Sequence, residues 1–187
     1  MQELLDQLDS IYPLSPELKQ HLFSITKHKV LRKREFLLKA GQINKEIHFI
    51  HKGLLWCYYK KEDKDFVSWF MKEGDMIASV SSFYDQQKSV DYIQAIEDCE
   101  LYYITYEELE EVYHTFAWFN YNGRVLTVKY LKFFEEKAKG LRGLTPEEKY
   151  AWMLEKKPEI LLRIPSRYMA AHLGINETML SRIRGKR

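Results

Sequence analysis

The chain has 187 residues and a mass of 22.5 kDa, and 45% of its residues are hydrophobic and 30% charged, as in folded proteins that bury a core. Aromatic residues reach 14%, which excludes disorder as the main state. No apolar run approaches the ~20 residues of a membrane-spanning helix, and the N-terminus lacks the pattern of a secretory signal. Two cysteines, Cys57 and Cys99, are too few for a disulfide framework or a cysteine zinc site. We therefore expect a cytoplasmic protein with no membrane partner.

The net charge of +2 is unevenly distributed along the chain. Residues 163–187 hold six basic residues and the single acid Glu177, so this segment carries +5 and residues 1–162 carry −3. A basic segment beside an acidic remainder favours contact with a polyanion, most often nucleic acid. A basic tail without a partner is the alternative interpretation of the charge alone.

Helical and extended patterns alternate along the first hundred residues. The first segment, to about residue 29, is predicted to be helical, with Ser15 as N-cap and Pro16 at the first helical position. From Val30 to about Ile104, short runs rich in β-branched and aromatic residues predict strands. We expect seven or eight strands, among them residues 36–38, 47–50, 54–59, 66–70 and 92–96. Their spacing indicates an all-β sandwich or barrel.

Helical periodicity returns after the strands. Thr105 and Glu108 have the spacing of a capping box. Between residues 117 and 141 a long helix is expected, because a mainly apolar stripe steps by threes and fours or their sums at Phe119, Leu126, Tyr130, Phe133 and Lys137. Such a stripe packs either on its own domain or on a second copy of the chain. Residues 145–148 then begin another helix, which Pro158 ends.

The last 22 residues have the pattern of a helix-turn-helix. A short helix at residues 166–173 ends at Gly174, and Asn176 is a good N-cap for a second helix that starts at Glu177. Gly174 readily adopts the left-handed conformation that a tight turn needs. Small and apolar side chains recur at the spacing that lets two helices cross steeply: Met169, Ala170, Leu173, Ile175, Leu180 and Ile183. The polar side chains left on the second helix suit base edges and phosphates of a major groove.

This order of elements resembles the Crp/Fnr family of bacterial transcription regulators. The similarity covers nearly the whole chain and is carried by GQINKEIHFIHKGLLWCYY, WFMKEGDMIASVSSF, SVDYIQAIEDCEL and, most specifically, IPSRYMAAHLGINETMLSRIRGK, which look like the Bacteroidetes branch. The resemblance implies an α+β fold with an N-terminal double-stranded β-helix (jelly-roll) sensor domain and flanking helices at residues 1–116. A long dimerisation helix at 117–143 and a C-terminal helix-turn-helix module at 144–187 would follow.

The resemblance also implies a DNA-binding surface. The recognition helix would span residues 177–185, and Arg182 would sit bidentate on a guanine. The implied DNA-binding residues are Ser166, Arg167, Asn176, Glu177, Thr178, Ser181, Arg182 and Arg184. Many members continue into a β-wing where this chain stops, so we expect the wing to be absent and Arg184, Lys186 and Arg187 to supply phosphate contacts instead. The implied partners are double-stranded DNA and a second copy of the chain, with RNA polymerase as a further candidate.

The resemblance suggests a cyclic nucleotide as a candidate effector. Family members that bind cyclic AMP use a Gly-Glu pair and an Arg-Ser pair, which align here with Gly74-Asp75 and Lys88-Ser89. Asp75 is one methylene shorter than glutamate, and Lys88 lacks the planar fork that grips a phosphate. The segment between the pairs, residues 76–87, is also longer and lacks glycines. These four residues are the candidate effector site, but the departures disfavour a cyclic nucleotide, and no other cofactor is implied.

Other chemistries find little support in the sequence. Two cysteines cannot supply four thiolates to an iron–sulfur cluster, and no motif of a metalloprotease, P-loop nucleotidase or serine hydrolase occurs. We therefore expect a regulator rather than an enzyme. The alternative is an effector-binding or protein-interaction module that does not bind DNA.

Overall fold

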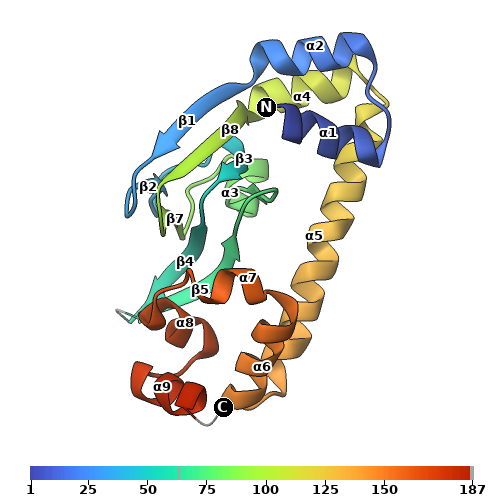
Figure 1. The fold of residues 1–187 in the computed structure, drawn as a ribbon. Coiled ribbons are helices and arrows are strands. Elements are labelled where there is room, and N and C mark those ends of the chain that lie inside the picture. The colour runs from blue at the N-terminus through green and yellow to red at the C-terminus, as the bar shows by residue number, and fades with distance from the viewer. Residues whose placement is uncertain (63, 186–187) are drawn as a thin grey trace.

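The computed structural model describes residues 1–62 and 64–185. Two N-terminal helices, α1 (Gln2–Ile11) and α2 (Pro16–Ile25), lie at one end of a β-roll, and a long helix, α5 (Phe119–Arg142), runs along it to a group of C-terminal helices (Figure 1). The helix α4 (Tyr106–Thr115) connects the last strand to α5. None of the described helices is both long and apolar enough to cross a membrane.

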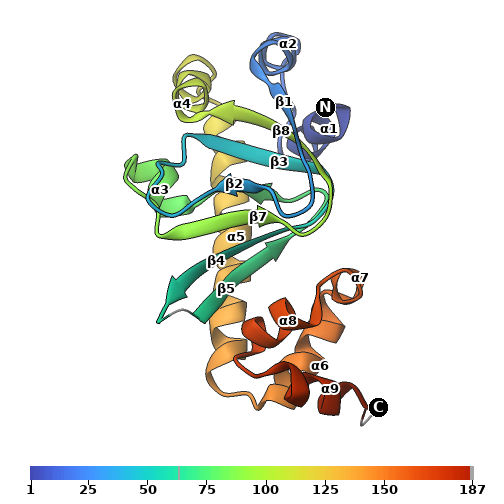
Figure 2. The same ribbon diagram turned by 90° about the vertical axis from the view of Figure 1, so that its left-hand side faces the viewer.

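Within the described residues, eight strands form two antiparallel four-stranded sheets, which confirms the predicted all-β unit. One sheet has the order β1-β8-β3-β6 and contains Lys27–Leu31, Cys99–Thr105, Glu46–Lys52 and Met76–Ile77, in that order. The other has the order β2-β7-β4-β5 and contains Phe36–Leu38, Asp91–Ala95, Leu55–Lys61 and Lys64–Met71. Figure 2 shows the strands of the roll crossing in front of α5.

The two-residue period of the strands divides the core into three clusters. On β3, His48 and Ile50 share one face, and Ile50 belongs to the cluster between the two sheets, whereas Phe49 packs against the N-terminal helices and α4. On β4, Leu55 and Cys57 face the space between the sheets. The strands β3 and β4 therefore have apolar partners on both faces, which explains their nearly continuous apolar runs in the sequence.

Two parts of the N-terminal half differ from the prediction. The expected helix does not reach residue 29, because α2 ends at Ile25 and Lys27–Leu31 forms β1, which pairs with β8 along its whole length. The predicted strands begin at Val30, three residues too late, because the period-2 signal of β1 is short and directly follows a helix. The segment between Gly74 and Lys88 also holds a short helix, α3 (Val80–Asp85), after β6.

The helices after the roll begin where the sequence signals place them. Thr105 and Glu108 form a complete capping box at the start of α4. Thr145 and Glu148 do the same for α6 (Pro146–Lys156), and a short helix, α7 (Pro158–Leu161), follows it. The chain ends in α8 (Ser166–Leu173) and α9 (Glu177–Gly185).

The C-terminal helices pack against the outside of the roll. The side chains of β4 alternate, so Trp56 and Tyr58, together with Leu54 just before the strand, point away from the space between the sheets and join a cluster with the C-terminal helices. The ring of Trp56 lies 3.9 Å from that of Tyr168 on α8, measured between centroids. The roll and the C-terminal helices thus share one continuous apolar core.

Candidate DNA-binding face and effector pocket

The two C-terminal helices have the geometry of a helix-turn-helix. Gly174 ends α8 with φ +71, the left-handed conformation, and the amide of Ile175 donates to the Ala170 carbonyl at 3.0 Å. The Asn176 side-chain oxygen then accepts the Met179 amide at 2.8 Å and caps α9. These local bonds explain why α9 leaves the turn in a defined direction relative to α8.

The helix α9 has one buried face and one exposed face. Leu180 and Ile183 are buried against α8 and the rest of the C-terminal core. Four of the predicted contact residues are exposed at the i, i+1, i+4 and i+5 positions of the opposite face: Glu177, Thr178, Ser181 and Arg182. The structure thus brings these four onto one solvent-facing surface, which we call the α9 face.

The remaining predicted contact residues make contacts within the protein. Arg184 donates to the Ser166 hydroxyl at 2.9 Å, which ties the last turn of α9 to the start of α8. Arg167 is exposed, donates to the Tyr168 hydroxyl and lies over its ring. The side-chain oxygen of Asn176 accepts the Met179 amide in the N-cap of α9. Lys186 and Arg187, expected to contact phosphates, lie outside the described residues.

The apolar stripe expected on the long helix packs on its own chain. Phe119 and Leu126 contact the N-terminal cluster, Tyr130 and Phe133 contact the roll, and Lys137 is buried. Another face of α5, together with its N-cap residue, carries large exposed side chains: Trp118, Tyr121, Val128 and Leu131. Of these, Trp118 and Tyr121 contact the ring of Tyr12, and Leu131 borders an apolar cavity beside the N-terminal helices. We call these four residues the outer stripe of α5.

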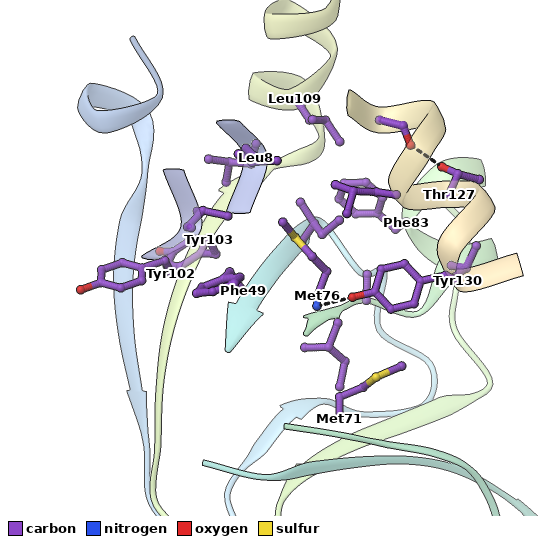
Figure 3. A pocket seen from close by; sticks show the side chains of 18 of the residues that line it. Leu8, Phe49, Met71, Met76, Phe83, Tyr102, Tyr103, Leu109, Thr127 and Tyr130 are labelled. Atoms are coloured by element: carbon purple, nitrogen blue, oxygen red, sulfur yellow. Dashed lines mark hydrogen bonds between the residues drawn. The ribbon is translucent and has the colours of Figure 1, made fainter. Parts of the chain in front are cut away.

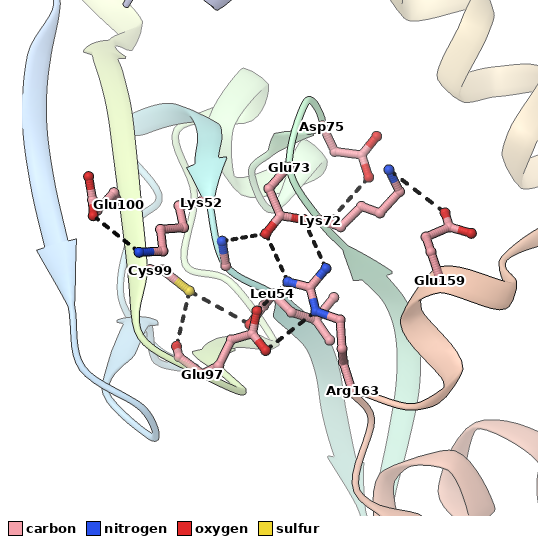
Figure 4. A network of polar contacts seen from close by, with 11 residues as sticks. Lys52, Leu54, Lys72, Glu73, Asp75, Glu97, Cys99, Glu100, Glu159 and Arg163 are labelled. Carbon is pink, nitrogen blue, oxygen red and sulfur yellow. Dashed lines mark hydrogen bonds and ion pairs between the residues drawn. The ribbon is translucent and has the colours of Figure 1, made fainter.

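A polar network joins the C-terminal helices to the roll (Figure 4). The Arg163 guanidinium, just before α8, donates to both oxygens of Glu73 at 2.9 and 2.8 Å and also bonds Glu97. Glu73 accepts the Gly53 amide at 2.8 Å as well. These donors outweigh the effect of burial and lower the pKa of Glu73 to about 2. The sequence offers no signal for this network, because Arg163 and Glu73 are 90 positions apart.

The cassette expected to hold an effector phosphate is filled by its own hydrogen bonds. The hydroxyls of Ser79 and Ser89 are 2.9 Å apart and buried, and the Ser79 hydroxyl donates to the Asp91 carboxylate at 2.7 Å. The Asn44 side-chain oxygen accepts the Ser79 amide at 2.6 Å. A bound phosphate would therefore meet a carboxylate and two hydroxyls that already have partners.

The other predicted effector residues lie apart from these hydroxyls. Gly74, at φ +81, and Asp75 form the turn before β6, where the Asp75 carboxylate accepts the Lys72 amide at 3.1 Å. Lys88 is exposed. Ser89 is thus the one of the four predicted residues that contacts the buried network, and its partner there is Ser79 rather than Gly74 or Asp75.

A polar cavity of about 300 Å³ opens between the sheets at residues 42–46. Three of its polar groups contact one another: Glu46 lies 2.5 Å from the Lys29 ammonium and 3.1 Å from the His48 ring. The contacts with His48 and Lys29 lower the pKa of Glu46 to about 2, and burial lowers the pKa of His48. The described residues contain no cluster of three or more metal-ligating side chains.

The roll and the whole chain are similar to known proteins. Residues 28–116 match the family model of the cyclic nucleotide-binding domain. The global regulator CLP of Xanthomonas campestris, described as c-di-GMP responsive, is similar in structure, with 18% identity, a TM-score of 0.73, and coverage of 92% of this chain and 91% of that one. No relative among the curated proteins matches the chain.

Two further solved structures share the full-length architecture. FixK2 of Bradyrhizobium japonicum is 17% identical with a TM-score of 0.76, and the match covers 87% of this chain and 84% of that one. The Catabolite Activator Protein of Thermus thermophilus is 16% identical with a TM-score of 0.58, and the match covers 96% and 85%. These matches confirm the predicted α+β fold, because the similarity extends over both the roll and the C-terminal helices.

Proposed function

We propose that this chain, which has the fold of the Crp/Fnr regulators, is a DNA-binding transcription regulator that acts as a homodimer in the cytoplasm. In this proposal residues 1–116 form the sensor, 117–143 the dimerisation helix and 144–187 the DNA-binding module. RNA polymerase is a candidate further partner.

The observation that carries the proposal is the α9 face. A recognition helix needs one face buried against its own module and another that presents polar side chains to base edges. The buried face of α9 contains Leu180 and Ile183. Its polar, exposed face contains Glu177, Thr178, Ser181 and Arg182. The Arg182 guanidinium has the shape to donate two bonds to a guanine, while the Glu177 carboxylate can accept from a cytosine amine.

Two residues near the α9 face act by positioning. The bond from Arg184 to the Ser166 hydroxyl fixes the crossing of α8 and α9, so Arg184 sets the direction of the recognition helix in addition to adding positive charge. The Asn176 cap fixes where the helix begins. We assign Arg182 to base reading and Arg184 to positioning and phosphate attraction.

The outer stripe of α5 supports the dimer. Leu131 is 64% exposed and Trp118 79% exposed, and with Tyr121 and Val128 they group exposed apolar side chains along one helix, as protein interfaces do. A 24-residue helix is about 36 Å long, which gives two copies a long line of contact. Two-fold symmetry would place two α9 faces roughly 34 Å apart on a pseudo-palindromic site.

The experiment is fluorescence anisotropy of the full chain with duplex DNA from its own upstream region and with random duplex. Arg182→Ala should weaken binding to the specific duplex by about tenfold or more and leave random duplex nearly unchanged. Arg32→Ala, a control at an arginine that is 75% exposed just after β1, should change neither. Equal loss on both duplexes for Arg182→Ala would remove it from base reading, and absence of any selected motif from a random DNA pool would refute the regulator.

The dimer has its own test. Leu131→Asp should shift the chain toward monomer in analytical ultracentrifugation, since it places a charge in the stripe. Leu162→Asp, at a leucine that is 98% exposed outside α5, is the matched control and should leave the association unchanged. Loss of the dimer in both variants, or in neither, would contradict the assignment of the outer stripe.

A further inference from the structure

An apolar cavity of about 300 Å³ lies between the roll, the N-terminal helices and α5 (Figure 3). Leu8 of α1, Phe49 of β3, Phe83 of α3 and Leu109 of α4 line it from different elements. Because Phe49 and His48 point to opposite faces of β3, this cavity is separate from the polar one between the sheets. The buried hydroxyls of Ser79 and Ser89 do not line it either.

The chemistry of the wall selects an uncharged, apolar occupant. Among the described residues that line the cavity there is no Lys, Arg, Asp, Glu or His, so a charged ligand would lose its hydration without compensation. Protein interiors are close-packed and rarely leave voids larger than a water molecule. The volume is twice the ~150 Å³ of an apolar cavity that takes up benzene, and it reaches the lower end of small-molecule pockets.

One polar group in the wall is placed to orient an occupant. The Tyr130 hydroxyl on α5 accepts the Met76 amide at 2.6 Å, which uses an oxygen lone pair and leaves the phenolic hydrogen free to be donated. Burial raises the pKa of Tyr130 to about 12, so this hydrogen is retained at neutral pH. The indole nitrogen of Trp69, another lining residue, is buried and has no hydrogen-bond partner among the described residues. The Tyr130 hydroxyl and the Trp69 indole are therefore two donors available to an acceptor on an occupant.

We propose that this cavity binds a neutral, largely hydrocarbon small molecule of about bicyclic size, oriented by a hydrogen bond from Tyr130 to a single acceptor on the ligand. Such a ligand would contact α1, α4 and α5 at once. The site does not depend on DNA binding, and it differs in position and chemistry from the predicted phosphate cassette.

The test uses the full chain and three neutral probes. N-phenyl-1-naphthylamine reports binding by its fluorescence, and naphthalene and 2-acetylnaphthalene compete with it; these two share a bicyclic body, but only the second has a carbonyl acceptor. We expect saturable binding, and tighter competition by 2-acetylnaphthalene by about five- to tenfold, the usual gain from one hydrogen bond. Tyr130→Phe should abolish the difference in affinity between 2-acetylnaphthalene and naphthalene while leaving the binding of naphthalene unchanged. Tyr59→Phe, an exposed tyrosine on β4, is the matched control and should preserve it.

Filling the cavity tests its location. Ala78→Trp should remove binding of all three probes, and Leu126→Phe, a milder filling change in the same wall, should weaken it at least severalfold, with circular dichroism confirming that both variants fold. Probe binding that survives both filling variants would overturn the proposal, as would equal affinity for the two competitors in the unchanged chain. Probe release as the protein concentration rises would show that a second copy occupies the cavity, which also overturns it.

Discussion

The network around Arg163 should contribute measurably to the attachment of the C-terminal helices to the roll. The change that tests this is Arg163→Met, which removes the guanidinium but keeps most of the aliphatic stem. Arg163 makes a two-bond contact with Glu73 and a further contact with Glu97, and the three side chains are 28%, 35% and 35% exposed. Hydrogen bonds to charged groups contribute about 1.5–3 kcal/mol when buried, whereas exposed ion pairs contribute about 0.2–1 kcal/mol. For this half-buried geometry we expect a loss of about 2 kcal/mol in the free energy of unfolding.

The acid dependence gives a second, independent readout. The pKa of Glu73 is lowered from 4.5 to about 2, so its contribution to stability is present above pH 4.5 and is lost as the pH falls toward 2. The Arg163→Met variant lacks the main cause of that shift, although Glu73 keeps the Gly53 amide as a donor. The stability difference between the two proteins should therefore be largest at pH 7 and shrink by pH 3.

The assay is urea unfolding followed by tryptophan fluorescence at pH 7 and pH 3, with Glu73→Gln added to complete a double-mutant cycle. Arg32→Met is the matched control, since the pair of Arg32 with Asp98 is 75% and 60% exposed and should contribute less than about 0.5 kcal/mol. A loss below about 0.5 kcal/mol for Arg163→Met, or a loss of the same size at both pH values, would show that the network is screened like a surface pair.

Three further outcomes are expected. Burial lowers the pKa of His172 from 6.5 to about 3, so the unfolded state binds more protons in that range. The free energy of unfolding should therefore decline by up to ~1.4 kcal/mol per pH unit as the pH falls below 6.5. In urea unfolding at pH 7 and 5, His172→Gln should reduce this difference in the free energy of unfolding, and His114→Gln, at an exposed histidine, should not. Gly53→Ala should cost about 2 kcal/mol or more in thermal unfolding, because φ is +107 and the new Cβ would lie 2.5 Å from the Cys99 sulfur, whereas Gly41→Ala has open space and only the strain of φ +87. DNA affinity measured by anisotropy should fall more than tenfold between 50 and 200 mM salt, and a fall below twofold would argue against phosphate contacts.

Local signals in the sequence were sufficient for the ends of most helices. The capping boxes at Thr105 and Thr145, the proline after Ser15 and the glycine at 174 act through hydrogen bonds and backbone angles within a few residues. Such interactions do not depend on the rest of the fold, so they are readable from the chain alone. The start of the strand Lys27–Leu31 was assigned to the preceding helix, because the strand is held by pairing with β8, more than 60 residues away.

The candidate DNA-binding face shows the same division between local and distant interactions. The helix-turn-helix pattern placed Glu177, Thr178, Ser181 and Arg182 on one side of a recognition helix, because that depends only on the helical period. It did not show that Arg184 turns back to Ser166, since that contact depends on the crossing of two helices.

By itself, the sequence determined the succession of elements, the family resemblance and the polar face of the last helix, all of which follow from short-range periodicity and caps. Only the tertiary structure decided which stripe of α5 faces its own roll, where Arg163 finds its two carboxylates, and that an apolar cavity forms beside Tyr130. These features arise where segments far apart in the chain meet, and their energies depend on burial and distance that no local pattern contains.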